Sequence, residues 1–133
     1  MVLFLSQDWL DLTVRLWAEE MDRPGPSVLV QFMVNGGPVP EAAYWWRLED
    51  GRLQQAGTGP IGGSGADVTV TQTYADAVDI QTAKMDANAA IMQGRVKVAG
   101  DLAKLMSILA LTASGPYKDL QRRIGAGTEY PGG

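Results

Sequence analysis

Residues 92–101, Met-Gln-Gly-Arg-Val-Lys-Val-Ala-Gly-Asp, decide the fold. Gly94 and Gly100 bracket a short alternating segment, which is typical of a β-strand between two turns. Because side chains alternate along a strand, Val96 and Val98 lie on one face and basic side chains on the other. One apolar face and one polar face predict a sheet that helices cover on one side only.

Apolar helices are expected on both sides of this strand. Asp86 and Asp101 are good N-cap residues, and they predict a short helix to residue 93 and a longer one over 101–113. The longer helix has an apolar stripe at helical spacing, formed by Leu102, Leu105, Met106 and Leu109. Ile108 and Leu111 lie off that stripe, so this helix is apolar on more than one side.

The remaining chain is predicted to contain further strands and helices. Ser6 is a plausible N-cap for a helix to residue 21, and Asp50-Gly51 is a strong hairpin signal. The other elements expected are strands over 27–34, 43–49, 52–56 and 67–71 and helices over 73–82 and 117–124. Short hairpins and segregated helices predict an α+β fold with a mainly antiparallel sheet.

The glycine-rich segment 57–65 contains the spacing G-x-G-x-x-G. A dinucleotide-binding fingerprint needs a buried strand before it and a helix after it. Here a polar strand precedes the segment, another strand follows it, and no P-loop lysine is present. We therefore expect a strand connection rather than a phosphate site.

The composition limits which catalytic, disulfide and metal sites this chain can form. The 133 residues suit one domain, and we expect it to span 1–124, with 125–133 as a flexible tail. Neither cysteine nor histidine is present, which removes disulfides, Cys-His and Ser-His-Asp sites and the commonest metal ligand. We expect no catalytic residue, no metal and no cofactor.

The charge is uneven along the chain. The net charge of −4 argues against nucleic acid as a partner. Residues 1–94 carry 12 acidic and 5 basic side chains, a net of −7, whereas residues 95–133 carry 3 acidic and 6 basic ones, a net of +3. A weakly basic face for transient contact with anionic membranes would be formed by Lys97, Lys104, Lys118, Arg122 and Arg123. The alternative is an ordinary solvated face.

No targeting or membrane-spanning segment is evident. The apolar start, residues 1–5, is too short for a signal-peptide core, and the longest apolar region, 105–113, is far shorter than a spanning helix. With no cysteine to form disulfides, a cytoplasmic location is expected.

Two segments together resemble a known family. Residues 66–71 (ADVTVT) and 82–101 (TAKMDANAAIMQGRVKVAGD), with the apolar helix after them, look like the sterol carrier protein 2 (SCP-2) sterol-binding domain. The resemblance covers residues 66–109. Ala83 stands where that family usually has glycine before lysine, and Ala87 where it often has proline.

This resemblance implies a five-stranded, mainly antiparallel sheet with about five helices covering one face. Between the two layers it implies an apolar tunnel for a sterol, a fatty acid or a fatty acyl chain. On the positions predicted to face inward, the candidate ligand-binding residues are Phe32, Val34, Val70, Ile91, Val96, Val98, Leu105, Met106 and Leu109. Each of these residues could equally be ordinary core.

Three functions stay open at this point. The first is a non-enzymatic carrier that binds a lipid or sterol-like ligand and presents or transfers it. The second is an interaction or oligomerisation module of the same fold, with the cavity filled by side chains. The third is a small enzyme using the carboxylates of Asp67, Asp76 or Asp86, although these residues fit strand ends and helix caps better.

Overall fold

The computed structural model describes residues 1–21, 23–38, 41–62 and 65–131. Its centre is a five-stranded sheet in the order β4-β3-β2-β5-β6. The strands are β2 (Val28–Asn35), β3 (Glu41–Glu49), β4 (Arg52–Thr58), β5 (Val68–Thr73) and β6 (Lys97–Gly100). Within this sheet β2 and β5 pair in parallel, and the other three neighbouring pairs are antiparallel.

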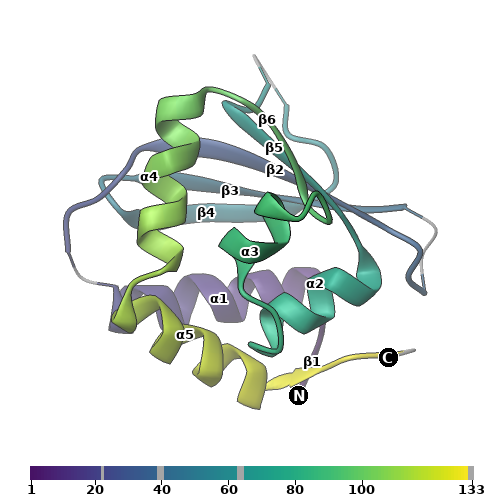
Figure 1. The fold of residues 1–133 in the computed structure, drawn as a ribbon. Helices are drawn as coiled ribbons and strands as arrows, with labels where there is room; N and C mark the ends of the chain where they lie inside the picture. The colour runs from purple at the N-terminus through teal and green to yellow at the C-terminus, as the bar shows by residue number, and fades with distance from the viewer. Residues whose placement is uncertain (22, 39–40, 63–64, 132–133) are drawn as a thin grey trace.

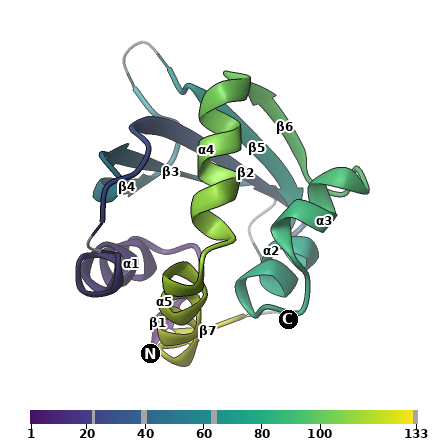
Figure 2. The same ribbon diagram turned by 60° about the vertical axis from the view of Figure 1, so that its left-hand side comes forward.

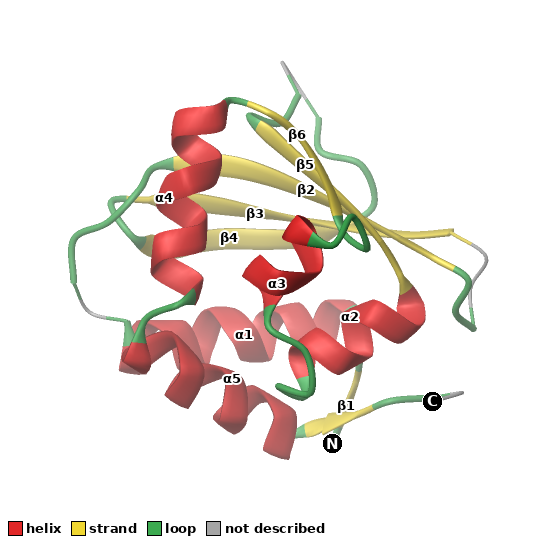
Figure 3. Cartoon of the chain, in the orientation of Figure 1, coloured by secondary structure: helices red, strands yellow, loops and turns green. Residues whose placement is uncertain are grey.

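The helices of the described chain lie on one side of this sheet (Figure 1). They are α1 (Gln7–Glu20), α2 (Tyr74–Gln81), α3 (Ala87–Met92), α4 (Leu102–Thr112) and α5 (Gly115–Ala126). The predicted α+β fold, with a mainly antiparallel sheet covered on one face, is therefore confirmed. Figure 3 shows the two layers by colour, with the helices red and the strands yellow.

The helix starts follow from a single local rule. Each N-cap side chain accepts a hydrogen bond from the backbone N–H three residues later, which satisfies one of the otherwise unpaired donors of the first turn. The N-caps of α1 to α5 are Ser6, Thr73, Asp86, Asp101 and Ser114.

The β3–β4 hairpin turns at Asp50 and Gly51, as predicted. Their φ angles are +50° and +78°, the positive values that the favoured two-residue hairpin turns require. Trp17 of α1 donates from Nε1 to the Gly51 carbonyl at 3.0 Å, so this turn also fixes the end of α1.

The glycine-rich segment connects β4 to β5 and leads into a strand, as expected. Gln31 of β2 alternates with the inward-facing Val30 and Phe32, so it lies on the uncovered face of the sheet. Its amide accepts from the Ile61 N–H at 2.7 Å and donates to the Gly59 carbonyl at 3.2 Å. These bonds tie the first part of the connection to the sheet; residues 63 and 64 lie outside the described residues.

The core contains a continuous row of aromatic rings. Neighbouring ring centroids lie between 4.4 Å (Phe32 and Tyr44) and 5.9 Å (Phe4 and Tyr74) apart. The row comprises Phe4, Trp9, Trp17, Phe32, Tyr44, Trp46, Tyr74, Tyr117 and Tyr130. It joins α1, the sheet and α5 through offset and edge-to-face contacts, each of which adds to simple burial.

The chain termini pair with each other, which differs from the expected domain boundary at residue 124. That boundary falls inside α5, and a second, two-stranded parallel sheet joins β1 (Val2–Leu3) to β7 (Thr128–Glu129). Thr128 is buried, and the Tyr74 hydroxyl donates to the Pro131 carbonyl at 2.6 Å. Residues 125–131 therefore pack as part of the same domain, because their backbone and side chains have partners in it.

Within the described ranges, no helix is both long enough and apolar enough to cross a membrane.

Candidate functional site

A cavity of about 310 Å³ lies between the sheet and the helices. Figure 2 shows α3 and α4 on the helix side of the sheet. The floor of the cavity is the helix-facing side of the sheet, and every helix from α2 to α5 contributes to its other walls. Most of the lining is apolar. Central lining residues are Val30, Phe32, Tyr44, Trp46, Val68, Val70, Val96 and Val98 from the sheet side and Ile91, Leu105, Ile108 and Leu109 from the helices.

The structure brings seven of the nine candidate ligand-binding residues together in this cavity. They are Phe32, Val70, Ile91, Val96, Val98, Leu105 and Leu109. Val34 lines a second pocket at the end of β2, and Met106 is 58% exposed. These two residues do not line the cavity.

Met106 lies outside because α4 is rotated relative to the expected stripe. Leu105, Ile108, Leu109 and Thr112 line the cavity, a spacing of three, four and seven residues from Leu105. This spacing marks one face of an α-helix. Leu102 and Met106 instead lie on the exposed side, so the expected stripe was wrong for these two.

Several lining residues were absent from the candidate set. Tyr44 and Trp46 alternate along β3 on its buried side, so strand alternation could have indicated them. Ile108 was noted as off the stripe, and it is buried against the cavity. Tyr117 comes from α5, and no local pattern places that helix beside the cavity.

Neutral polar groups also lie in the cavity wall. Burial raises the pKa of Tyr117 to about 12, and burial, reinforced by the charge of Tyr117, raises the pKa of Tyr44 further. Both phenols are therefore neutral at ordinary pH. Trp46 Nε1 and Asn88 Oδ1 are buried and have no hydrogen-bond partner among the described residues. The wall thus holds neutral hydrogen-bonding groups that a ligand or water could use.

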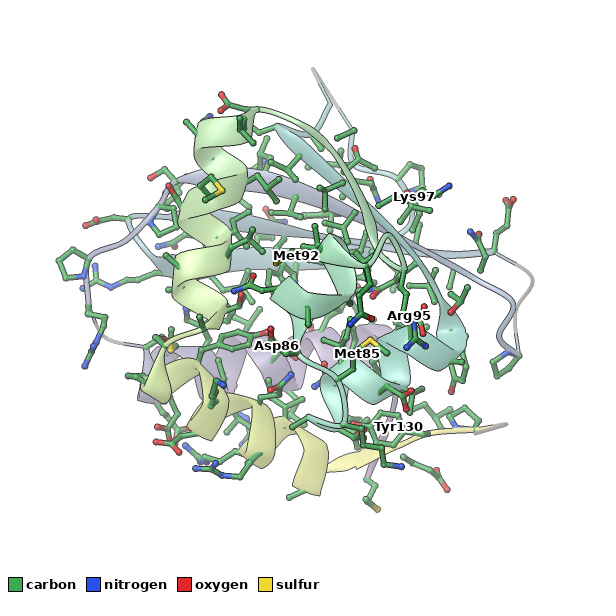
Figure 4. All side chains as sticks on the ribbon, viewed as in Figure 1. Met85, Asp86, Met92, Arg95, Lys97 and Tyr130 are labelled. Atoms are coloured by element: carbon green, nitrogen blue, oxygen red, sulfur yellow. The ribbon has the colours of Figure 1, made fainter. Side chains whose placement is uncertain are left out.

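Charged side chains are confined to the helix side of the lining. They are Asp86, Lys118 and Arg122, of which Asp86 caps α3 and Arg122 pairs with Asp119. Figure 4 labels Asp86 beside Met85 in the segment that joins α2 to α3. The sheet side of the cavity carries no charged side chain within the described lining.

The three carboxylates considered for catalysis all have structural partners. Asp67 accepts from the Leu29 N–H at 2.9 Å and pairs with Lys104 at 3.2 Å. Asp76 pairs with Arg95 at 2.6 Å, and Asp86 accepts from the Ala89 N–H at 3.0 Å. Across the described residues, no cluster of three or more acids could hold a metal ion.

The close approach of β6 to β5 depends on Gly100. Its φ is +121°, and a Cβ added there would lie 2.1 Å from the Asp67 carbonyl oxygen. Only glycine fits such a position. This close pairing places Val98 opposite Val70, so that both line the cavity.

Solved structures share this architecture. A crystal structure of sterol carrier protein 2 superposes with a TM-score of 0.72 at 16% identity, covering 89% of this chain and 97% of that one. A conserved hypothetical protein from Thermus thermophilus gives 0.71 at 16% identity, covering 91% and 89%. The palmitated SCP2L2 of Aedes aegypti gives 0.55 at 20% identity, covering 75% and 88%. At these identities the likeness shows the fold alone.

Sequence comparison gives the family. No curated protein matches the chain, but the model of the SCP-2 sterol transfer family matches residues 27–112. The matched range runs from β2 to the end of α4 and contains the sheet and most of the cavity lining. The resemblance seen in residues 66–109 is therefore confirmed, and the chain belongs to the SCP-2 sterol transfer family.

Proposed function

We propose that this protein binds one hydrophobic ligand in the cavity between sheet and helices and carries or presents it without chemical change. The ligand class is a sterol, a fatty acid or a fatty acyl chain. Family membership supports lipid binding or transfer in general. The cavity supports the space between sheet and helices as the place where the ligand binds.

The single observation that carries the proposal is the size and lining of the cavity. A volume of about 310 Å³ lies at the lower end of the range for small-molecule sites. Each buried methylene contributes roughly 0.8 kcal/mol, so ten would contribute about 8 kcal/mol before the costs of association. The alternative of a cavity filled by side chains is less favoured, because this space remains open.

The neutral polar groups suit a ligand that is mostly hydrocarbon with one hydrogen-bonding group. Tyr117 and Tyr44 can both donate and accept while staying uncharged. A charged group on the sheet side would lose its hydration without meeting a countercharge there. A hydroxyl, a carbonyl or a protonated acid therefore fits the interior, and an ionised carboxylate fits better beside Lys118 and Arg122 on α5.

One structural neighbour supports the class of ligand. The Aedes aegypti protein was solved in a palmitated form. We extend this class of ligand to the present chain as part of the proposal, since seven of the residues proposed here for ligand contact line one cavity between its sheet and its helices.

Ligand exchange would take place in the cytoplasm with transient contact at anionic membranes. The basic residues considered for this contact differ in availability. Lys104 pairs with Asp67, Arg122 with Asp119, and Arg123 with Glu19 and Glu20. Lys97 and Lys118 have no ion pair within the described ranges, and they are the two that we expect to contact lipid headgroups.

Direct binding tests the proposal. We expect a fluorescent fatty acid or sterol to saturate the purified, delipidated protein at one ligand per chain. Unlabelled lipid should displace it, and mass spectrometry of an organic extract should identify the lipid acquired during expression. A folded protein that binds nothing from a broad lipid panel, and sediments instead as a stable oligomer, would favour the interaction-module alternative.

A further inference from the structure

We propose that Phe4 sets the maximum length of the ligand by closing one end of the cavity. This inference rests on the proposed lipid-binding function and adds a residue that determines specificity. It begins with a second pocket, also of about 310 Å³, at the end of the sheet near the chain termini.

Phe4 is the one residue of the described chain that lines both spaces. A side chain that lines two neighbouring cavities forms part of the wall between them. On the far side of Phe4 the second pocket is mostly apolar, with Leu3, Val34, Ala42 and Tyr74 among its lining. An acyl chain that passed this wall would therefore enter space that is also mostly apolar.

The structure holds the Phe4 ring in place from three sides. Its ring centroid lies 4.8 Å from that of Trp9, 5.1 Å from that of Tyr130 and 5.9 Å from that of Tyr74. The ring is 6% exposed. Such packing makes it a fixed barrier rather than a mobile side chain.

The backbone at Phe4 is fixed as well. The Phe4 N–H donates to the Glu129 carbonyl at 2.9 Å, which continues the pairing of the two chain ends. The next residue, Leu5, has a φ of +71°, a conformation that non-glycine residues seldom adopt. Strain of this kind persists where the surrounding structure determines the position of a residue. Leu5 directly follows Phe4, whose side chain lines both spaces.

Shortening Phe4 should join the pockets. With the wild-type ring, affinity for saturated fatty acids should rise about fourfold with each added methylene, until the chain reaches Phe4, and then level off. In Phe4→Ala, affinity should keep rising with chain length beyond the wild-type limit and level off only at longer acids. Phe4→Leu keeps an apolar core side chain and disturbs folding less. It should also raise the chain length at which affinity levels off, but by a smaller amount.

The experiment is a competition series with unbranched acids from octanoic to eicosanoic, each displacing the same fluorescent fatty acid from the wild type and from each variant. Val34→Ala is the matched control, because it enlarges the second pocket without touching the wall. We expect its profile to follow the wild type. Circular dichroism and a cooperative thermal transition would show that each variant is folded.

The outcomes separate the two proposals. A wild-type protein that binds no acid overturns the role of Phe4, and one that also binds no sterol overturns the lipid-binding function as well. A wild-type protein that binds acids, with a folded Phe4→Leu or Phe4→Ala variant that levels off at the wild-type length, overturns the role of Phe4 alone. A shift in Val34→Ala equal to that in Phe4→Ala would also overturn it, because the wall would then not lie at Phe4.

Discussion

Ala83 shows what one residue can reveal about a local conformation. It follows α2 and has a φ of +63°. The Ala83 N–H bonds the Ile80 carbonyl, and the Lys84 N–H bonds the Asp79 carbonyl. This is the arrangement in which helices commonly end on a left-handed residue, usually glycine. The departure noted in the sequence, alanine where glycine is usual, therefore falls at a position where a Cβ is unfavourable.

We predict that Ala83→Gly raises the free energy of unfolding by about 1 kcal/mol, because it relieves the left-handed strain. The same substitution at Ala110, exposed in the last turn of α4, should lower it by up to about 1 kcal/mol, because glycine is a poorer helix former than alanine. Urea denaturation measures the free energy of unfolding of both variants. Destabilisation by both changes would contradict the assignment of strain at Ala83.

Asp67 gives a prediction about pH. The hydrogen bond from the Leu29 backbone N–H, together with Lys104, lowers the pKa of this carboxyl below its usual value. A lowered folded-state pKa gives stability that is present above the unfolded pKa of about 3.9 and is lost as pH falls through the folded pKa. The free-energy difference between wild type and Asp67→Asn should therefore be constant near neutrality and shrink below about pH 4.

Chemical denaturation at a series of pH values would measure this difference. Lys104→Met should remove the smaller, ion-pair part of the effect while the backbone hydrogen bond remains, so it is the matched comparison. A difference between wild type and Asp67→Asn that stayed unchanged down to pH values well below about 4 would show that the charge of Asp67 contributes nothing to stability.

At the scale of elements, periodicity found every strand of the main sheet and every helix, but it could not orient α4. That helix carries Leu102, Leu105, Met106, Ile108, Leu109 and Leu111 within ten positions. With apolar residues on all sides, several arcs are equally plausible inward faces, and only packing against the sheet selects one. β1 and β7 were missed for another reason: each has two residues, too few to show any period.

The orientation of α4 makes its own prediction. Leu109→Ala should weaken ligand binding by about 1–2 kcal/mol, roughly tenfold in Kd, because it removes apolar contact from the cavity wall. Met106→Ala, one turn away on the exposed side, should leave Kd unchanged. Titration with a fluorescent fatty acid compares the two. Equal losses in both variants would mean that α4 presents another face to the ligand.

At the scale of the whole molecule, the parts of the cavity wall that come from α5 and the chain ends are what the sequence could least predict. The resemblance to the SCP-2 family implied a tunnel, and local spacing indicated the inward positions, seven of which line the cavity. Local spacing could not indicate Phe4 or Tyr117, because their place depends on how α5 and the chain ends pack against elements more than fifty residues away in sequence. The expected domain boundary at residue 124 left out residues 125–131 for the same reason, because their contacts are with residues far away in sequence.

The pairing of the chain ends should therefore matter for both stability and binding. A chain ending at Gly127 would lose the buried Thr128, the Phe4–Glu129 backbone bond and the ring contact between Phe4 and Tyr130. We expect its free energy of unfolding to be about 3 kcal/mol below that of a chain ending at Pro131, from the hydrogen bonds and aromatic contact removed. Calorimetry would measure the loss. Because Phe4 would then be held on fewer sides, the shortened chain should also accept longer fatty acids than the reference, as Phe4→Leu does. If stability fell while the length profile stayed the same, the terminal strands would support the fold without positioning the wall of the cavity.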